Sequence, residues 1–549
     1  MDSKNIVVIG GGHNGLVSAA YLARAGHKVS VLESRCSVGG AASSDTTTFP
    51  GYTLSTASYL NSLFLPEIVS DLDLKRFGYE VILRNPSSFT PLPDGRTLLL
   101  GPDMDANMRE IAKFSSRDAL AYPRYEKELG EIADWVAKLM TMTPPNIPPC
   151  SWRDIENLCA LARHTLRLNP VQMYRLTKLL HTNPAEYLDQ WFESDILKAT
   201  LLTDALIGAT KMSGYVLLHH VMGEAGGARG VWGYMRGGMG GISSALRASC
   251  EEHGVTIHCN AHALRITLTG DKTVSGVVSK IHHESWKNPK RNFDSADVVI
   301  SAISPTYTFA TLLSSHEGIV RDVRRAIATK DNNSASMKIN CVLSGVPDFY
   351  AMRGTEIGPQ HKGTIHISPS VGYILDALKD YRDGTPSREP MLELTIPSAL
   401  DDTLAPPLHH VMNIFLQCYP YDNKPDSEQR KMQYFEGVVT NILRRYIANW
   451  DAIYVDAQVL SPHNLEQEFG MVGGNIFHGG MGLSQLFSFR PIRGMANYRT
   501  PIKGLYLSGA GTHPGGGVTG ACGYNAAREV LYDLAPPPEA TSRDYMFPG

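Results

Sequence analysis

A glycine-rich turn close to the N-terminus constrains this chain more than any other feature. The turn has the pattern Gly-x-Gly-x-x-Gly and consists of Gly10, Gly12 and Gly15. The apolar run 6–9 precedes it, and a continuous β-branched run is typical of a parallel strand buried on both faces. Residues 16–25 then have the pattern of a helix ended by a glycine, and residues 28–32 that of a second strand. This order of elements predicts a dinucleotide-binding βαβ unit.

Each residue type in the turn has a physical reason. Gly10 permits the tight turn, Gly12 lets the backbone approach a pyrophosphate, and Gly15 lets the helix close on the strand. The start of the helix directs free N–H groups and the positive end of its dipole at the same anion. Glu33 ends the second strand, where a carboxylate accepts hydrogen bonds from ribose hydroxyls.

A second glycine pair distinguishes FAD from NAD as the predicted cofactor. Gly39 and Gly40 follow Glu33 closely and continue into Ala41 and Ala42. This segment resembles the motif that lies beside the pyrophosphate and ribityl chain in FAD enzymes, and NAD domains usually lack it. Ala41 stands where those enzymes commonly have an arginine, so a guanidinium contact is not expected there.

A glycine-rich loop near the C-terminus is predicted to complete the cofactor site. It follows the strand 504–508 and precedes a helix over 521–534, and so many glycines indicate that backbone approaches a ligand. The alternative is a tight turn between strand and helix. From this segment we assign to the cofactor Gly509, Gly516, Gly517 and Thr519, and we expect the last three to lie closest to the isoalloxazine ring.

The middle of the chain supplies the remaining elements of this predicted domain. A glycine-rich segment 236–241 precedes a helix over 242–253, two strands over 256–259 and 263–267, and a strand at 296–302. Ala263, in the second of these strands, is also assigned to the cofactor site. The predicted fold is α/β, with a discontinuous Rossmann-type FAD-binding domain and an inserted α+β substrate domain. The predicted ranges are 1–59, 235–305 and 496–535 for the FAD-binding domain, 60–234 and 306–495 for the substrate domain, and 536–549 for a tail.

Charge and composition favour a small-molecule partner. A formal charge of −3 gives no global field that would attract nucleic acid. No apolar run reaches the ~18 residues of a membrane helix, and no cysteine pair has the Cys-x-x-Cys spacing of a metal or dithiol site. Residues 155–166 have a basic amphipathic pattern. A solvated helix face is the first interpretation of that pattern, and peripheral contact with a membrane is the alternative.

The motifs also resemble known families. Residues 9–17, 39–42, 296–301 and 508–515 look like the phytoene desaturase and carotenoid isomerase type of flavin amine oxidase-like proteins. The likeness to the family of pyridine nucleotide-disulfide oxidoreductase domain-containing protein 2 extends over about residues 4–534. Its further motifs lie at residues 57–60, 83–86, 189–194, 214–223, 396–401 and 473–478.

That resemblance implies an FAD-dependent oxidoreductase linked to mitochondrial function. It also implies a cytochrome oxidase subunit as a partner and the mitochondrial matrix as the location. The sequence shows no presequence ahead of the first strand, so the cytoplasm is the alternative location. The disulfide chemistry of the family name is not expected, because the chain has neither a Cys-x-x-Cys nor a second Gly-x-Gly-x-x-Gly after a strand.

Catalytic candidates are few. His219 and His220 lie in an apolar stretch, and His478, Arg490 and His513 lie in later glycine-rich segments. For each histidine, a buried structural role is the first interpretation, and a direct chemical role is the alternative. No cysteine or histidine falls in a recognised flavin-attachment motif, so the FAD is expected to be bound non-covalently.

Three functions remain open at this point. The leading hypothesis is an FAD-dependent dehydrogenase or desaturase that acts on an apolar small molecule. The second is a flavin-stabilised regulator that binds a respiratory complex with little turnover. The third is a redox-neutral, FAD-dependent isomerase.

Overall fold

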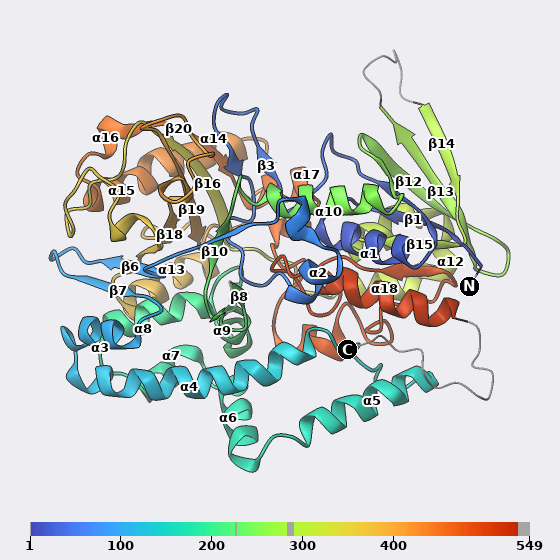
Figure 1. Cartoon of the computed structure of the whole chain (residues 1–549), viewed down its shortest axis with the longest axis horizontal. Coiled ribbons are helices and arrows are strands. Elements are labelled where there is room, and N and C mark those ends of the chain that lie inside the picture. Colours follow the sequence, from blue (N-terminus) through green and yellow to red (C-terminus); the bar gives the residue numbers. More distant parts are fainter. Residues whose placement is uncertain (1, 226–227, 283–289, 536–549) are drawn as a thin grey trace.

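A computed structural model describes residues 2–225, 228–282 and 290–535 of the chain. Figure 1 shows two halves side by side. One half is built on a five-stranded sheet and contains the N-terminus, and the other is built on a seven-stranded sheet with a layer of helices below it.

The five-stranded sheet is entirely parallel and has the order β11-β2-β1-β15-β21. Its strands are β1 (Asn5–Ile9), β2 (Lys28–Leu32), β11 (Thr256–His258), β15 (Val298–Ser301) and β21 (Leu505–Leu507). Strand β15 pairs with β1 through Val298 and Ile6, and with β21 through Val299 and Leu505. The loops after β1 and β21 therefore lie at the same edge of one sheet.

Both faces of this sheet are covered, which explains the apolar run in β1. Ile6 and Val8 pack with the helices on one face, and Val7 and Ile9 pack with the layer on the other. The helices on the first face are α1 (His13–Arg24), α10 (Gly240–Glu252) and α18 (Ala521–Leu534). The second layer contains β12 (Ala261–Leu268), β13 (Val274–Ile281), β14 (Lys290–Ser295) and α12 (Glu317–Ala328).

The seven-stranded sheet is mixed and has the order β20-β16-β19-β18-β17-β6-β7. Its strands are β6 (Ser88–Pro91), β7 (Thr97–Leu100), β16 (Ser336–Leu343), β17 (Thr364–Ile367), β18 (Met391–Thr395), β19 (His410–Gln417) and β20 (Tyr454–Leu460). One face is apolar and packs with α14 (Ser427–Tyr434), α15 (Thr440–Tyr446) and α16 (Trp450–Ile453). The other face carries buried polar side chains, among them Lys338, Asn340, Glu393 and Asn413.

A helical layer lies beside this sheet. Its helices are α3 (Met104–Ala112), α4 (Ser116–Leu139), α5 (Trp152–Thr165), α6 (Pro170–His181), α7 (Pro184–Asp189), α8 (Asp195–Leu202), α9 (Gly214–Val221) and α13 (Val371–Arg382). One hydrophobic cluster joins all of these helices except α5, which contacts α4 through the stacked rings of His164 and Trp135. The short elements that connect the two halves include β5 (Val81–Leu83), β10 (Gly233–Met235), α2 (Pro66–Asp71) and α17 (Pro462–Phe469). Among the described helices, none combines the length and the apolar character that crossing a bilayer requires.

The α/β class with a Rossmann-type sheet is confirmed. Strand β2 and helix α18 have the predicted bounds, whereas α1 begins at His13 instead of residue 16. The helix starts earlier because Gly12 already has the extended backbone of an N-cap residue. The predicted limits between the two domains stay a prediction.

Candidate functional site

The loop after β1 has the geometry that the glycine pattern predicts. Gly10 has a φ of +100°, and its N–H donates to the carbonyl of Leu32 at 2.9 Å. A Cβ atom on Gly15 would lie 2.0 Å from the carbonyl oxygen of Gly10, so only glycine fits there. Gly12 is different, because a Cβ atom there would lie 3.9 Å from its nearest neighbours, Gly39 and Gly40. Gly12 is half-buried and therefore has room for a Cβ atom in ordinary van der Waals contact with the second glycine pair.

Glu33 lies at the end of β2 and is buried. Its carboxylate accepts hydrogen bonds from the N–H groups of Gly11 and Arg35, each at 2.8 Å. The hydroxyl of Ser34 also donates to the carboxylate oxygen that Arg35 contacts, at 3.3 Å. These bonds hold the glycine loop and the end of β2 in register, and the oxygen that faces Gly11 can accept one further hydrogen bond. Ala263 lies on β12, where it is buried at the same end of the sheet as Glu33.

The second glycine pair meets the first loop directly. The N–H of Gly39 donates to the carbonyl of Gly11 at 2.8 Å, and Gly12 and Gly39 form an isolated parallel bridge. Gly40 has a φ of +56° and remains half-buried beside Gly12. Ala42 is fully buried, and its carbonyl accepts a hydrogen bond from Ser243 of α10 at 2.6 Å. Gly40 is thus partly accessible beside Gly12, whereas Ala42 is buried and joins the loop to α10.

The C-terminal loop crosses the same edge of the sheet and then meets the other half of the molecule. A Cβ atom on Gly509 would lie 2.5 Å from the carbonyl oxygen of Ala302, which explains the glycine by packing alone. Gly517 has a φ of +119°, and a Cβ atom there would lie 2.6 Å from Nε2 of His219. A Cβ atom on Gly516 would lie 2.7 Å from Phe477. The two glycines that we expected to face a flavin ring therefore also make room for neighbouring side chains.

Backbone strain marks the end of this loop. Val518 has a φ of +57°, a conformation that β-branched residues rarely adopt. The Oγ1 atom of Thr519, which is buried, accepts a hydrogen bond from the N–H of Ala521 at 3.0 Å at the start of α18. Strain of this kind costs on the order of 1–3 kcal/mol and is concentrated at functional sites.

The structure brings two of the candidate histidines to this loop. His219 is fully buried in α9, and its ring lies perpendicular to that of Phe477, with 5.7 Å between the ring centroids. His478 has a φ of +56° and is half-buried. Burial and the charge of Arg490 lower the pKa of His478 to about 4, so its ring is neutral at pH 7. The side chain of His220 lies outside the described residues.

Arg490 is almost completely buried and joins the segments that contain these groups. Its guanidinium donates to the backbone carbonyls of Thr512 at 3.1 Å and Ala510 at 2.9 Å, and also to that of Phe477. Burial lowers its pKa to about 10, so the group stays charged at pH 7. His513 has a structural contact, because its Nε2 lies 2.7 Å from the carbonyl oxygen of Leu139.

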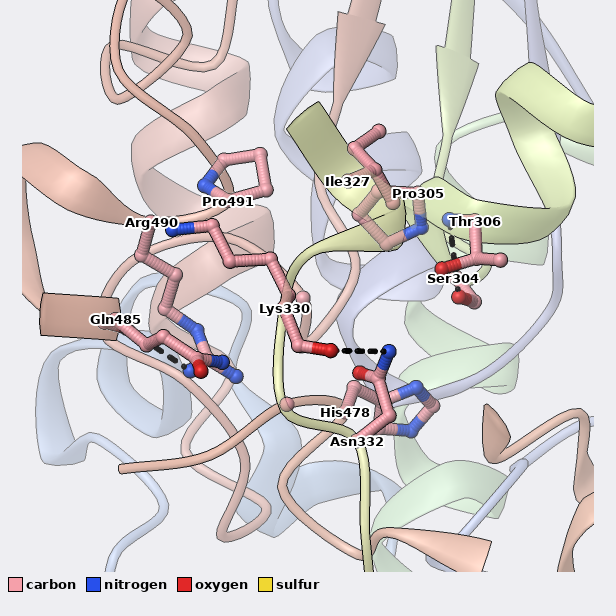
Figure 2. Close-up of a pocket in the computed structure, with 12 residues that line it drawn as sticks. Ser304, Pro305, Thr306, Ile327, Lys330, Asn332, His478, Gln485, Arg490 and Pro491 are labelled. Atoms are coloured by element: carbon pink, nitrogen blue, oxygen red, sulfur yellow. Dashed lines mark hydrogen bonds between the residues drawn. The ribbon is translucent and has the colours of Figure 1, made fainter. Parts of the chain in front are cut away.

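A small pocket opens beside these residues. Figure 2 shows His478 and Asn332 on one side of it, Lys330 and Arg490 on another, and Ser304 at the end of the loop after β15. Its volume of about 30 Å³ has room for water molecules and not for a ring system. The pocket is therefore an opening beside the candidate cofactor site and not the site itself.

Three buried polar atoms near the sheet edge have no hydrogen-bond partner among the described residues. They are Nδ1 of His13, Nδ1 of His478 and Oγ of Ser508. An unsatisfied buried group costs about 1–3 kcal/mol. His13 is the first residue of α1, and burial followed by the charge of His478 lowers its pKa to about 4. These atoms, together with the half-buried backbone at Gly12 and Gly40, fit a ligand with a polar diphosphate.

A polar cluster on the seven-stranded sheet was not predicted from the sequence. Tyr59 follows a segment that is bonded to the second glycine loop, because the N–H of Ser58 donates to the carbonyl of Ala41 at 3.0 Å. The hydroxyl of Tyr59 donates to Glu393 at 3.3 Å, and Nζ of Lys338 lies 5.3 Å from the centre of its ring. The polar face of the seven-stranded sheet therefore lies next to the loops of the candidate cofactor site.

Burial shifts the pKa values of the ionisable groups in this cluster. Burial, followed by the charge of Asp204, raises the pKa of Glu393 to about 8. Burial, followed by the charge of Glu126, raises the pKa of Asp204 to about 7. Asp204 and Tyr59 nevertheless keep part of their surface accessible to solvent. Lys338 is buried and has a pKa well below its usual range because of that burial.

A sequence signal for this cluster exists. Lys338 and Asn340 interrupt an otherwise apolar strand at every second position, as does Glu393 in the apolar strand β18. Such interruptions indicate a buried polar face only when neighbouring strands place theirs beside them.

Comparison with known proteins identifies the family. The model of the NAD(P)-binding Rossmann-like domain matches residues 8–66. The rat pyridine nucleotide-disulfide oxidoreductase domain-containing protein 2 is 40% identical over 96% of this chain and 93% of its own length. The chain belongs to that protein's family. The predicted resemblance is thereby confirmed for nearly the whole chain.

More distant relatives agree with this assignment to the pyridine nucleotide-disulfide oxidoreductase domain-containing protein 2 family. Phytoene desaturase (lycopene-forming) from a Paracoccus species is 23% identical over 97% of this chain and 98% of its own length. A solved structure of putrescine oxidase bound to putrescine has a TM-score of 0.56 at 14% identity and covers 97% of this chain and 99% of that one. The chain is an oxidoreductase with the fold of flavin amine oxidases, which supports a flavin or nucleotide cofactor.

Proposed function

We propose that this protein is an FAD-dependent dehydrogenase that oxidises a small organic molecule at a C–H bond. The observation that supports this most is the convergence of three glycine loops, 10–15, 39–40 and 509–519, at one sheet edge. Buried polar atoms without a partner among the described residues lie beside these loops. A parallel sheet binds its cofactor at this edge.

Different residues of the candidate cofactor site would contact different parts of FAD. The N–H groups at the start of α1 would face the pyrophosphate, and Glu33 would accept hydrogen bonds from the ribose. The start of α18 and the charge of Arg490 place positive potential at the C-terminal loop, where a reduced, anionic flavin ring is favoured. Bound flavin supplies two-electron oxidation chemistry.

The first test concerns the cofactor itself. The purified protein should be yellow, and acid precipitation should release the flavin into the supernatant, where chromatography should identify it as FAD. This follows from the lack of a recognised attachment motif. Colour that stays with the precipitated protein would show that the flavin is covalently bound.

The second prediction concerns nicotinamide. NADH and NADPH should reduce the bound flavin slowly or not at all, because the one predicted dinucleotide fingerprint is assigned to FAD. Stopped-flow measurement of flavin absorbance, with dithionite as the positive control, checks this. Fast reduction that saturates with NADH concentration would contradict the assignment.

The substrate half supports an apolar substrate next to the ring. Leu63 and Phe477 line the approach to Gly516 and Gly517, and both are buried apolar side chains. The name of the related phytoene desaturase points to a hydrocarbon substrate for that protein. We therefore retain a desaturase or dehydrogenase acting on an apolar molecule as the leading proposal.

Amine oxidation is a second candidate, which Asp204 and Glu393 favour specifically. Two desolvated carboxyl groups with raised pKa values would be stabilised in their ionised form by a protonated amine. The carboxyl groups ionise only above their raised pKa values of about 7 and 8, so amine binding should strengthen as the pH rises from 6 to 9. The flavin spectrum of the holoprotein, titrated with n-hexylamine and with 1-hexanol as the neutral control, reports this binding. Equal responses to both ligands, or an unchanged response in Glu393→Gln, would reject amine recognition.

One experiment distinguishes the regulator and isomerase hypotheses from the proposed dehydrogenase. After anaerobic photoreduction, a dehydrogenase should be reoxidised rapidly by dioxygen or a quinone, whereas a regulator should not. An isomerase should act while its flavin stays reduced. A location in the mitochondrial matrix is a further proposal that rests on the family resemblance, and cell fractionation tests it.

A further inference from the structure

Helix α5 presents its apolar face to solvent. Trp152 and Leu166, at the two ends of the exposed stripe, have exposed fractions of 71% and 83%, and Ile155 lies between them at 41%. Ile155 lies one turn and Leu166 about four turns after Trp152, so the three side chains share one side of the helix. The opposite side carries Asp154, Asn157 and His164, which are all buried. This arrangement is the reverse of an ordinary amphipathic surface helix.

The buried polar side fixes this orientation. Asp154 accepts hydrogen bonds from the N–H of Asn146 at 2.9 Å and from the side chain of Asn497 at 3.2 Å. The ring of His164 stacks on Trp135 of α4, with 5.0 Å between their centroids. Rotation of the helix that buried its apolar face would break these contacts, and buried polar groups without partners are costly.

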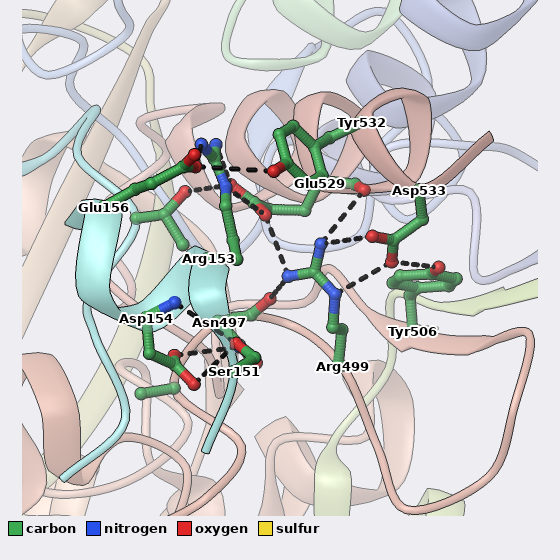
Figure 3. Close-up of polar contacts among 12 residues, drawn as sticks. Ser151, Arg153, Asp154, Glu156, Asn497, Arg499, Tyr506, Glu529, Tyr532 and Asp533 are labelled. Atoms are coloured by element: carbon green, nitrogen blue, oxygen red, sulfur yellow. Dashed lines mark hydrogen bonds and ion pairs between the residues drawn. The ribbon is translucent and has the colours of Figure 1, made fainter. Parts of the chain in front are cut away.

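A second anchor joins α5 to the C-terminal helix α18. Figure 3 shows Arg153 pointing from α5 to Glu529 of α18, and Nη2 of Arg153 lies 2.8 Å from the carboxylate. Arg499 contacts the same carboxylate at 2.8 Å from the other side. Because α18 begins at the C-terminal glycine loop, α5 is held firmly to the half that contains the candidate cofactor site.

The neighbouring residues extend the exposed face and give it charge. Val171 and Tyr174 of α6 are exposed, with fractions of 56% and 65%. Arg163 and Arg167 are also exposed and flank the apolar stripe of α5. In the described part of the chain neither arginine forms an ion pair. We call this surface the α5–α6 face and define it by Trp152, Ile155, Leu158, Leu166, Val171 and Tyr174 with the two arginines.

We propose that the α5–α6 face docks the protein peripherally on an anionic lipid surface. Apolar side chains enter the boundary between headgroups and acyl chains, and Trp and Tyr favour that boundary because one end of each ring system is polar. The two arginines complement anionic headgroups, although the whole chain carries a formal charge of −3. Helices α5 and α6 lie along the lower edge of the molecule in Figure 1, and the apolar side chains of the face are exposed.

The test is co-flotation of the full-length holoprotein with vesicles of phosphatidylcholine alone or with 30% phosphatidylglycerol. The parent protein should float with the anionic vesicles and much less with the neutral ones. Trp152→Ser with Leu166→Ser should weaken binding at least tenfold, because it removes the two most exposed side chains of the stripe. Arg163→Gln with Arg167→Gln should remove the dependence on anionic lipid and on salt.

A matched control uses exposed apolar residues elsewhere. Leu408→Ser with Tyr350→Ser removes side chains with exposed fractions of 86% and 55% outside this face and should leave flotation unchanged. Thermal unfolding and flavin content should be the same in all variants. No binding to anionic vesicles by the parent protein would overturn the proposal, as would equal loss in the control pair.

Two other occupants of the face give distinct results. If light scattering shows a dimer that Trp152→Ser with Leu166→Ser dissociates, and vesicles do not bind, the face is a contact between two copies. If vesicles bind only after residues 536–549 are deleted, that segment is the occupant of the face in the intact chain. Either outcome would overturn membrane docking.

Discussion

Gly12→Val should yield a folded protein that contains no flavin. The variant is informative because the protein itself leaves room at this position, where a Cβ atom meets nothing closer than 3.9 Å. Gly12 also has a φ of −69°, which valine adopts readily. The backbone and the neighbours of Gly12 therefore tolerate a Cβ atom, and we expect the methyl groups of valine to project into the region that we assign to the pyrophosphate. We expect at least a hundredfold loss of FAD affinity, or about 2.7 kcal/mol.

Two companion variants make this result specific. Gly15→Ala places its Cβ atom 2.0 Å from a backbone oxygen and should lower the thermal stability of the apoprotein, whereas Gly12→Val should not. Glu33→Ala should lose about ten- to a hundredfold in FAD affinity, because charged hydrogen bonds contribute about 1.5–3 kcal/mol. Unfolding of the apoproteins and flavin titration separate these effects. Normal flavin content in Gly12→Val would place the cofactor elsewhere.

The half built on the five-stranded sheet could be predicted because each of its sequence motifs can be recognised within one short segment. Strand β2 and helix α18 have the predicted bounds, and the fingerprint at Gly10, Gly12 and Gly15 lies between the expected strand and helix. Such a pattern needs only its own segment to be recognised, because each glycine answers a local steric demand. The pairing of β15 with both β1 and β21 follows from the same buried, parallel pattern.

The C-terminal loop shows where a local signal was incomplete. The glycines at 516 and 517 were assigned to a flavin ring, yet Gly517 also accommodates His219 from a helix about 300 residues earlier in the chain. Its φ of +119° disfavours any side chain as well. A Gly517→Leu variant would therefore not test the position of the flavin ring alone, because it would disturb the backbone and α9 as well as a cofactor.

The polar cluster and helix α5 needed the tertiary structure. Glu393 and Lys338 become neighbours of Tyr59 only after strands and a connecting segment from three parts of the chain align. The periodicity of α5 identified one apolar face correctly and could not tell that the other face is buried. That choice depends on Asn497 and Trp135, which are distant in sequence.

Glu529→Gln should be among the most destabilising single substitutions in this protein. Its carboxylate is completely buried between Arg153 and Arg499, each 2.8 Å away, and also accepts a hydrogen bond from Thr143 at 2.6 Å. Glutamine has nearly the same shape as glutamate but no charge, so both arginines lose the carboxylate that they share. Removal of one partner from a buried pair costs about 3–5 kcal/mol. The matched control is Glu252→Gln, whose exposed pair with Arg76 should contribute no more than about 1 kcal/mol.

The pH dependence distinguishes the charge of Glu529 from its packing. Burial alone would raise its pKa, but the hydrogen bond from Arg153 and the charges of both arginines outweigh burial and hold the pKa below its usual range. A lowered folded pKa stabilises the protein above the unfolded value of about 4.3, and this contribution disappears as the pH falls through the folded value. Parent protein and Glu529→Gln should therefore differ most in thermal midpoint near pH 7 and converge below about pH 4. A difference that is independent of pH would assign the effect to packing at α18, and the charged anchor between α5 and α18 would then have no energetic support.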